Sequence, residues 1–341
     1  MSSKLGSQAS SESSGLAFFG RQFTKPKPLP SDTQLSEHVA IVTGSSSGLG
    51  FEAARQLLAL GLAHLIVAVR SQEKGDLAAG KLRDEFPKAT VSVWILDLES
   101  YDSIQAFAER CQTLPRIDIV VLNAGLRKPS FTTVPSTHHE TVIQVNYLST
   151  ALLAILLLPV LKSKATPTRP PTLTFSGSDL MYTVASSKGK DPILQQFDDA
   201  KAYNQFSVYS KSKLLLAVFA AKLAEFVDPK DVLVHVTNPG MTKGTNMFRE
   251  SSAPAKLIFG ALNKMMGRPA EIAASNYVYS TVVSGQDDHG SFVSDWTVKP
   301  FPEMWYTPEG QEYSSRLWDE TMEEFKFAGA SKILDDLRGA Q

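Results

Sequence analysis

Short apolar segments alternate with amphipathic segments along most of this 341-residue chain, and that order restricts its fold more than any other feature. Runs of β-branched and apolar residues predict strands within 39–44, 64–70, 90–98, 117–125, 171–178 and 231–240. Apolar residues at helical spacing predict helices over 50–61, 75–86, 101–112, around 138–162, and from Tyr209 onward. Strands that are apolar throughout are covered on both faces, as in a parallel sheet with helices on each side. The sequence therefore predicts an α/β fold built on a doubly wound parallel sheet.

The charge balance and the cysteine count narrow the class of protein. Lysine and arginine total 34 residues against 35 aspartates and glutamates, so no net positive field would attract nucleic acid. Cys111 is the only cysteine, which excludes an internal disulfide and favours a reducing compartment. The longest apolar run, 151–161, is too short to span a bilayer and contains Pro159, so we expect a buried helix and no integral membrane segment. These features predict a soluble, cytoplasmic protein without nucleic-acid partners.

The chain is expected to form one large domain with additions at both ends. Residues 1–35 are predicted to be an N-terminal extension, and its Ser-rich first part, up to about residue 15, has the composition of a disordered segment. The predicted domain covers 36–330, and residues 331–341 would form a C-terminal tail.

The stretch TGSSSGLG, residues 43–50, stands between the first predicted strand and the first predicted helix. Its three glycines permit a tight turn and would let a pyrophosphate approach the backbone. The helix that follows offers unpaired N–H groups and the positive end of its dipole to an anion. A glycine pattern alone also fits a purely structural turn, but the strand–turn–helix context indicates a nucleotide-binding loop.

Tyr209 and Lys213 stand four residues apart in the stretch VYSKSKLLLAVFAAKLAE, at the start of a predicted helix. This spacing places both side chains on one face of the helix. One interpretation is structural, with Tyr209 packed in the core and Lys213 in solvent. The other is an acid–base pair, in which the ammonium lowers the pKa of the phenol from its usual value of ~10.

Five motifs that follow one another along the chain resemble the short-chain dehydrogenase/reductase family. They are the Gly-x-x-x-Gly-x-Gly loop, LDL with Asp97 and Leu98, NAG at 123–125, Tyr-x-x-x-Lys at 209–213, and NPG at 238–240. The stretches TGSSSGLGFEAARQLL at 43–58 and FTKPKPLP at 23–30 resemble a fungal branch of this family. The similarity extends over roughly residues 36–295. It implies the Rossmann form of the doubly wound sheet and an oxidoreductase that binds a nicotinamide dinucleotide.

The resemblance also implies four catalytic residues. Tyr209 would exchange a proton with the substrate oxygen. Lys213 would hold the nicotinamide ribose and, together with the positive charge of an oxidised nicotinamide, lower the pKa of the phenol. Asn146 would hold a water in a proton relay, although it fits equally well as a helix-packing amide. The fourth is a hydroxyl at the end of the fifth strand, and strand alternation puts Ser176 and Ser178 on the same side. The family's usual pattern favours Ser178.

The end of the second predicted strand indicates which dinucleotide binds. An acidic residue there would bond the ribose hydroxyls of NAD, whereas a basic one accommodates the 2′-phosphate of NADP. The chain has Arg70 at this point, and a guanidinium is a bidentate donor suited to phosphate. Lys74 would add a second charge, although a solvated lysine is the simpler interpretation. NADP(H) is therefore the expected cofactor. The resemblance implies a cofactor site made of Gly44, Ser46, Ser47, Gly48, Leu49, Gly50, Arg70, Lys74, Asp97, Leu98, Asn123, Ala124, Gly125, Tyr209, Lys213, Pro239, Gly240 and Thr242.

Two segments are expected to cover the substrate. Residues 179–208 form a long insertion before Tyr209, which predicts a substrate loop over the site. Residues 242–270 stand where the family keeps its lid. An apolar pocket would be lined by a minority of Met181, Tyr182, Met247, Phe248, Phe259, Met265 and Met266. The predicted mechanism needs no metal, and the histidines of THHE at 137–140 are expected at the surface.

These features predict an NADP(H)-dependent oxidoreductase of fungal secondary metabolism that interconverts a fairly large apolar ketone or aldehyde and its alcohol. Tyr209 would be the general acid or base. Two alternatives stay open: a redox-neutral epimerase or dehydratase with the same fold, and a non-catalytic NADP(H)-binding regulator. The presence of both Tyr209 and Lys213 argues against the regulator. Members of the family often associate as dimers or tetramers through their long helices, although N-terminal extensions can change that, so the oligomeric state stays open between a homodimer, a homotetramer and other states.

Overall fold

A computed structural model describes residues 1–165, 169–184, 191–243, 260 and 263–339. Its centre is an eight-stranded sheet in the order β3-β2-β1-β4-β5-β6-β7-β8. The strands are β1 (Val39–Thr43), β2 (His64–Val69), β3 (Thr90–Ile95), β4 (Ile119–Leu122), β5 (Thr172–Ser176), β6 (Leu233–Asn238), β7 (Ser291–Ser294) and β8 (Thr297–Lys299). Neighbouring strands are parallel except β7 and β8, which pair antiparallel. The predicted doubly wound sheet is confirmed, and two strands that we did not predict extend it.

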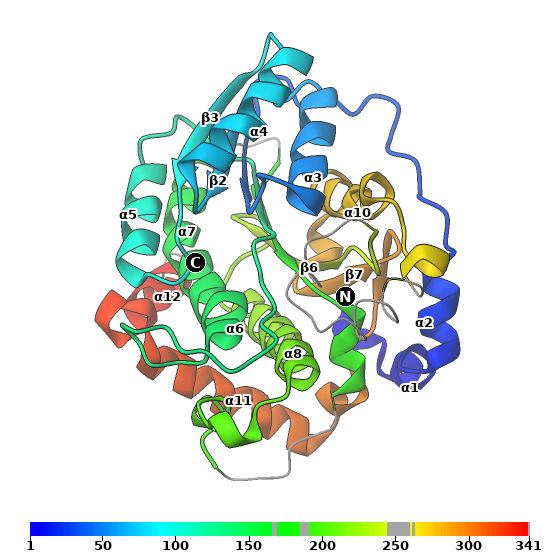
Figure 1. Ribbon diagram of the computed structural model, residues 1–341, viewed down its shortest axis with the longest axis vertical. Helices are drawn as coiled ribbons and strands as arrows, with labels where there is room; N and C mark the ends of the chain where they lie inside the picture. The colour runs from blue at the N-terminus through cyan, green and yellow to red at the C-terminus, as the bar shows by residue number, and fades with distance from the viewer. Residues whose placement is uncertain (166–168, 185–190, 244–259, 261–262, 340–341) are drawn as a thin grey trace.

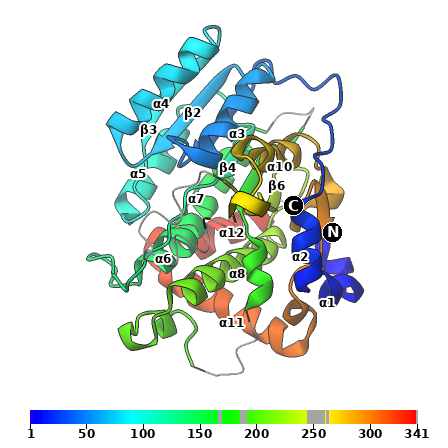
Figure 2. The same cartoon turned by 45° about the vertical axis from the view of Figure 1, so that its right-hand side comes forward.

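Helices cover both faces of this sheet (Figure 1). The longer ones are α2 (Gly15–Gln22), α3 (Gly48–Ala59), α4 (Gln72–Glu85), α5 (Tyr101–Cys111), α7 (Thr150–Ser163), α8 (Gln205–Ala224), α10 (Ala270–Val282), α11 (Pro308–Glu324) and α12 (Ala330–Gly339). Shorter ones are α1 (Ala9–Glu12), α6 (Thr141–Ile143), the π-helical turn η3 (Gln144–Ser149), and the 3-10 helices η1 (Ser2–Lys4), η2 (Gly6–Gln8), η4 (Asp179–Thr183), η5 (Gln195–Phe197), η6 (Ala200–Ala202), η8 (Gln286–Asp288), η9 (Glu303–Tyr306) and η10 (Lys326–Ala328). Figure 2 shows α3 and α10 side by side on one face.

The strand order reverses between β1 and β4, which sets the place of the site. β2 and β3 lie on one side of β1, whereas β4 to β8 lie on the other. Every residue of β1, β4, β5 and β6 is buried, as expected for strands covered on both faces. In open sheets of this kind ligands bind outside the carboxyl ends of the strands, where the order reverses.

The helical stretch Thr141–Ser163 is long and apolar enough to cross a membrane by composition alone, but 94% of its most apolar window is buried inside the protein. The expectation of a buried helix at 151–161 is therefore confirmed. The stretch is not a uniform α-helix, because Gln144–Ser149 forms a π-helical turn before α7 begins. Such turns are frequent at functional sites, and this one carries Asn146.

The first fifteen residues differ from the expectation of disorder. They form short helices, and Ser2 is fully buried against the edge of the sheet. The Ser2 N–H donates to Ser291 Oγ at 3.0 Å, and the Phe292 N–H donates to Ser2 Oγ at 2.8 Å. These bonds join positions about 290 residues apart, which is why composition gave no sign of them.

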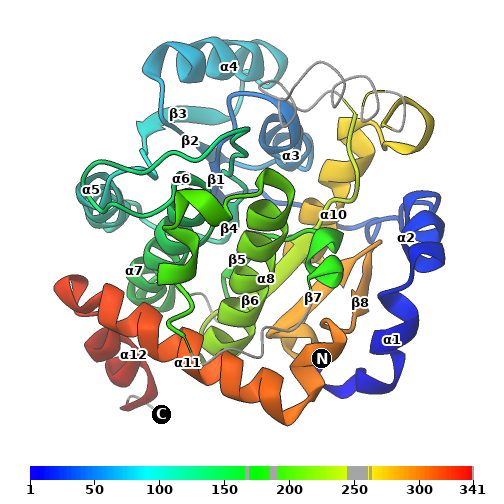
Figure 3. The ribbon, with the colours of Figure 1, turned by 60° about the horizontal axis from the view of Figure 1, so that its bottom comes forward.

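The C-terminal helices cover α7 and α8, the long helices through which we expected subunits to associate (Figure 3). Trp318 of α11 stacks on Phe219 of α8, with ring centres 5.6 Å apart. The hydroxyl of Tyr147 lies 2.6 Å from Thr321 Oγ1. Residues 331–339, expected to be a tail, belong to α12, whose Leu334 and Leu337 are buried.

The predicted substrate loop and lid are described in part. In the loop, η4 begins directly after Ser178, and α8 begins at Gln205, with the Asn204 side chain accepting bonds from the first N–H groups. Met181 is fully buried in the core, and the Tyr182 hydroxyl donates to the Pro300 carbonyl at 2.5 Å. Of the expected pocket residues in the lid, Met247, Phe248 and Phe259 lie outside the described residues; Met265 is 78% exposed.

Candidate active site

The loop between β1 and α3 has the backbone shape that its glycines predict. Gly44 and Gly48 have φ values of +66° and +60°, which other residues rarely adopt. A Cβ atom at Gly50 would lie 2.5 Å from Asn123 Nδ2 and 2.7 Å from the Gly44 carbonyl oxygen, so only glycine fits there. α3 begins at Gly48, which turns its unpaired N–H groups and the positive end of its dipole toward the loop. The loop, which includes Ser46, Ser47 and Leu49, thus has the shape and polarity of a phosphate site.

The end of β4 holds this loop in place. Asn123 Nδ2 donates to the Thr43 carbonyl at 2.9 Å, and the Ala124 N–H donates to Thr43 Oγ1 at 2.9 Å. The predicted NAG motif and the glycine loop, about 80 residues apart in sequence, therefore form one surface.

Arg70 lies at the neighbouring strand end, beside the turn that carries Asp97 and Leu98. Its guanidinium pairs with Glu99 Oε1 at 2.6 Å and is 64% exposed, so it remains accessible to a phosphate. Asp97 Oδ1 accepts the Glu99 N–H at 3.0 Å and keeps that turn closed. Lys74 is exposed in the first turn of α4. The structure therefore places Arg70, Lys74, Asp97 and Leu98, which we expect to bind the adenosine end of the cofactor, near the carboxyl ends of β2 and β3.

Asn146 and Lys213 converge on Gly125. A Cβ atom at Gly125 would lie 3.1 Å from Asn146 Oδ1 and 3.8 Å from Lys213 Nζ. The Asn146 amide accepts the Leu126 N–H at 2.8 Å and donates to the Leu126 carbonyl at 2.9 Å and to Ser212 Oγ at 3.1 Å. These bonds give Asn146 a clear packing role; the predicted water relay stays a prediction.

Tyr209 and Lys213 are both buried on α8, which rules out the interpretation of Lys213 as a solvated charge. They are 5% and 4% exposed, and Lys213 Nζ lies 5.8 Å from the centre of the Tyr209 ring. The ammonium donates to the Ser176 carbonyl at 2.8 Å, which ties α8 to the end of β5.

Ser176 and Ser178 turn out to have different partners. Ser176 Oγ lies 2.6 Å from the hydroxyl of Tyr277 on α10. Ser178 lies beyond the end of β5, close enough to Tyr209 for its side chain to lower the pKa of the phenol. Strand alternation does not apply to Ser178, because the strand has already ended. Ser178 is thus the serine beside the phenol.

Comparison with known proteins establishes the family. A family model described as short chain dehydrogenase matches residues 38–167. Over 340 residues, 99% of each chain, this protein is 55% identical to the short chain dehydrogenase virL of Hypocrea virens. The chain belongs to the short-chain dehydrogenase/reductase family. It is also 47% identical to the short chain dehydrogenase/reductase mfmJ of Annulohypoxylon moriforme, over 94% of each chain. The predicted resemblance is confirmed, and the protein is an oxidoreductase by family.

Solved structures of the same family share its fold. A short chain oxidoreductase of Pseudomonas aeruginosa PAO1 with NADPH bound has a TM-score of 0.58 at 23% identity, over 76% of this chain and 95% of its own. A putative short chain dehydrogenase of Escherichia coli CFT073, complexed with NADPH, has a TM-score of 0.57 over 78% and 99%. At this identity the likeness concerns the fold alone.

The pKa of Tyr209 in this dehydrogenase differs from our expectation. Burial raises it to about 12, and the charge of Arg127 and the hydrogen bond with Ser178 lower it by less. Burial also lowers the pKa of Lys213 to about 8. Among the groups of the protein itself, burial therefore outweighs the nearby charges, because both residues lie in a water-poor interior; the lowering expected from an oxidised nicotinamide stays a prediction.

Arg127 is the charged group near Tyr209 that we did not predict. It lies two residues after the NAG motif, is 8% exposed, and places its guanidinium 5.9 Å from the centre of the Tyr209 ring. The same guanidinium stacks at 4.0 Å on Phe206, which is 38% exposed. The sequence did offer a signal for this residue, because Arg127 stands two residues after the NAG motif that follows β4.

The turn after β6 completes the site. Gly240 has a φ of +79°, and its N–H donates to Asn238 Oδ1 at 3.1 Å. Thr242 Oγ1 donates to the Gly240 carbonyl at 3.0 Å, and the Pro239 carbonyl accepts from Arg268. The NPG turn and Thr242 therefore lie at the carboxyl end of β6, and their contact with the cofactor stays a prediction.

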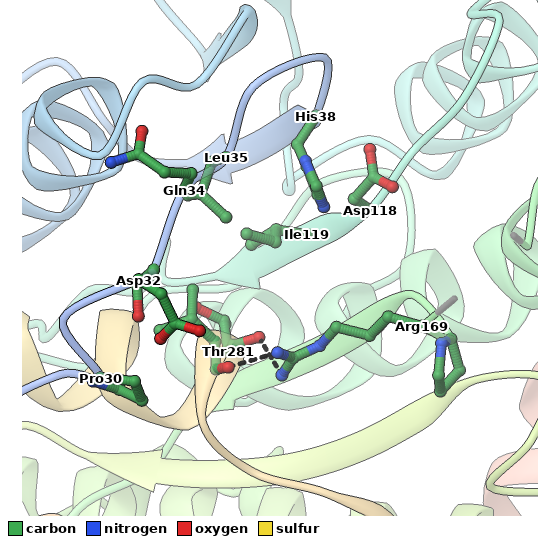
Figure 4. A pocket seen from close by; sticks show the side chains of 12 residues that line it. Pro30, Asp32, Gln34, Leu35, His38, Asp118, Ile119, Arg169 and Thr281 are labelled. Carbon is green, nitrogen blue, oxygen red and sulfur yellow. Dashed lines mark hydrogen bonds between the residues drawn. The ribbon is translucent and has the colours of Figure 1, made fainter. Parts of the chain in front are cut away.

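A pocket on the molecule lies away from this site, where β1 and β4 begin (Figure 4). Its charged residues include Asp32, Asp118 and Arg169. Arg169 donates to the carbonyls of Thr281 at 3.0 Å and Ser284 at 3.1 Å, which caps the end of α10. The guanidinium therefore stabilises the fold. The pocket lies at the amino ends of the strands, whereas Tyr209 lies near their carboxyl ends.

Proposed function

We propose that this dehydrogenase uses NADP(H) to interconvert a fairly large apolar ketone or aldehyde and its alcohol, chiefly as a reductase in fungal secondary metabolism. The observation that carries the proposal is the group formed by the buried Tyr209 and Lys213 and the half-buried Ser178, beside the glycine loop. Relatives named as short chain dehydrogenases in Hypocrea virens and Annulohypoxylon moriforme support the fungal setting.

The phenol of Tyr209 is in the protonation state that a reduction requires. A phenol with a pKa of about 12 stays protonated near neutrality, which is the form that gives a proton to a carbonyl oxygen. Ser178 would donate a hydrogen bond to the same oxygen. Lys213, fixed by the Ser176 carbonyl, would hold the nicotinamide ribose with its remaining protons.

NADPH, when bound, would supply the hydride that the substrate carbon accepts. The glycine loop would hold its pyrophosphate, and Asn123, Ala124 and Gly125 would line the path toward the nicotinamide. Arg70 would pair with the 2′-phosphate, since an exposed guanidinium is suited to bidentate contact with phosphate. This arrangement supports NADP(H) over NAD(H).

The substrate side supports an apolar, partly aromatic compound. Phe206 is exposed near Tyr209 and stacks on Arg127, and Phe131 and Tyr203 form an edge-to-face pair with ring centres 5.9 Å apart. Aromatic side chains next to a catalytic group favour flat apolar substrates.

The test is an assay of NADPH oxidation with a panel of aryl and alkyl ketones, using wild type and Tyr209→Phe. We expect NADPH-dependent formation of alcohol by the wild type and a loss of about 10²–10⁴-fold in kcat for the variant, the range for a general acid. Product formed without net NADPH oxidation would instead indicate a redox-neutral enzyme. NADPH binding with no turnover of any carbonyl compound would indicate a regulator.

A further inference from the structure

The N-terminal segment reaches the active site from outside the sheet. Helices α1 and α2 lie beside β8 (Figure 3), where Lys299 Nζ pairs with Glu12 Oε1 at 2.7 Å. At the other end of the segment, Gln22 Oε1 accepts the Met241 N–H at 3.1 Å, directly after the NPG turn. The segment is therefore bonded both to the sheet edge and to a loop of the site.

Arg21 is the buried charged residue of this segment. It is 5% exposed, and its Nε lies 3.1 Å from Asp179 Oδ2. Its second nitrogen, Nη1, pairs with Glu12 Oε2 at 2.7 Å, and the guanidinium stacks on the Tyr182 ring at 5.3 Å. Arg21 thus joins α1, α2 and η4 in one buried contact.

Asp179 directly follows Ser178 and is held at both carboxylate oxygens. Arg21 binds Oδ2, and Asn238 Nδ2 donates to Oδ1 at 2.6 Å. Asn238 is the first residue of the NPG turn, so one carboxylate links the N-terminal segment, Ser178 and the loop after β6. The charged or titratable groups that face Asp179 are Arg21 from α2, Arg268 and Asp295 beside β7, and Tyr182 from η4.

The chain geometry limits where Ser178 can go. Ser178 has an extended backbone, and its Oγ accepts the Leu180 N–H at 3.2 Å as the cap of η4. Asp179 is the first residue of η4, so a movement of its carboxylate moves the serine next to it. A buried carboxylate that loses its cation must move toward water or take up a proton.

We propose that Arg21 is a positioning residue for the reaction: by holding Asp179, it fixes the Ser178 hydroxyl beside Tyr209. The N-terminal segment is then a working part of the active site. This inference rests on the proposed function, because the role of Ser178 does.

The test compares kcat, KM and NADPH affinity of the wild type with Arg21→Met and Arg21→Lys. We expect Arg21→Met to lower kcat by about 10–100-fold, within the range for loss of one positioned group, while the dissociation constant of NADPH changes less than twofold. Arg21→Lys should recover most of the loss, since an ammonium still reaches one oxygen of Asp179. Glu12→Gln is the matched control: it removes the other ion pair of Arg21 and leaves Asp179 bound, so its kcat should stay within about twofold of wild type.

A pH profile separates positioning from general damage. Burial raises the pKa of Asp179 to about 6, and the charge of Arg21 holds it down. Without Arg21 the carboxylate takes up its proton at higher pH, so the acid limb of kcat should move upward in Arg21→Met and stay in place in Glu12→Gln. If Arg21→Met does not fold, Arg21→Met/Asp179→Asn removes the unpaired charge and should have the same kcat as Asp179→Asn alone.

Two results would overturn the inference. One is an Arg21→Met enzyme with the kcat and acid limb of the wild type. The other is an Arg21→Met/Asp179→Asn variant whose loss of kcat, on a logarithmic scale, equals the sum of the losses of the two single variants. The two residues would then act independently. An inactive wild type contradicts the proposed function itself, and the inference with it; an active wild type with an unaffected Arg21→Met contradicts the inference alone.

Discussion

Lys213 Nζ lies 5.8 Å from the centre of the Tyr209 ring and 2.8 Å from the Ser176 carbonyl oxygen, and water reaches neither side chain freely. The ammonium is therefore held by the end of β5. Burial affects the two groups oppositely: it raises the pKa of the phenol and lowers that of the ammonium. Both shifts have consequences that can be measured.

The buried charge of Lys213 should cost stability. Its folded-state pKa of about 8 lies below the unfolded value, so the cost is complete below about pH 8 and fades as pH rises from there toward 10.5. Lys213→Met should stabilise the protein by about 1 kcal/mol at pH 7, less near pH 10, and should abolish turnover. Urea unfolding at both pH values measures this. Lys222→Met, on the same helix but pairing at the surface, should change stability by less than about 0.5 kcal/mol. Lower stability of Lys213→Met at both pH values would contradict the burial argument.

Reductive activity should have two pH limits. As pH rises through about 8, Lys213 loses its proton and kcat/KM for the ketone should fall, while Tyr209 stays protonated. As pH falls through about 6, Asp179 is protonated and its ion pair with Arg21 is lost. Initial rates between pH 5 and 10 test this. A profile that stays flat up to pH 10 would show that the charge of Lys213 is not required.

Substitution by alanine should have opposite effects on stability at Gly50 of the glycine loop and at Gly80 of α4. Gly50→Ala forces a Cβ within 2.5 Å of Asn123 Nδ2 and 2.7 Å of the Gly44 carbonyl, so we expect a loss of about 1–3 kcal/mol in stability and a loss of NADPH binding. Gly80→Ala, in the middle of α4, meets no atom within 4 Å and should stabilise by about 0.5–1 kcal/mol. Thermal unfolding and nucleotide titration of both variants test the contrast; equal behaviour would contradict it.

The sequence predicted those parts of the fold that depend on residues close to one another along the chain. Strands β1 to β6 are apolar runs, and the strand-end motifs lie where the strands end. The first fifteen residues were misjudged because the hydrogen-bond partners of Ser2 are Ser291 and Phe292, far along the chain. β7 and β8 have four and three residues, too few for a periodic pattern.

The site was predicted to a similar extent. Tyr209, Lys213 and Ser178 meet as expected, but the choice between the serines could not follow from alternation, because Ser178 lies beyond the strand. The pKa of Tyr209 could not be foreseen either, since the cost of burial depends on how completely the phenol is enclosed. Arg127 is two residues from a motif that we had identified, yet only the structure brings it to the phenol.

We expect the protein to be a monomer, one of the states that the sequence left open. α11 and α12 cover α8 and α7, and Trp318 stacks on Phe226 with ring centres 4.6 Å apart. Light scattering after size exclusion should give a mass near 37.2 kDa at all concentrations. Trp318→Ala should uncover apolar surface of α8, cost about 3–5 kcal/mol and promote association. A wild type with twice the monomer mass at every dilution would refute this.

The central claim is that the glycine loop and Arg70 form an NADP(H) site, and a fluorescence titration with NADPH and NADH tests it most directly. Wild type should bind NADPH at least about tenfold more tightly than NADH, a difference of ~1.4 kcal/mol. Arg70→Ala should remove that difference, whereas Lys81→Ala, an equal change of charge on the exposed side of α4, should keep it. Binding of neither nucleotide by the wild type would contradict both the cofactor site and the proposed oxidoreductase.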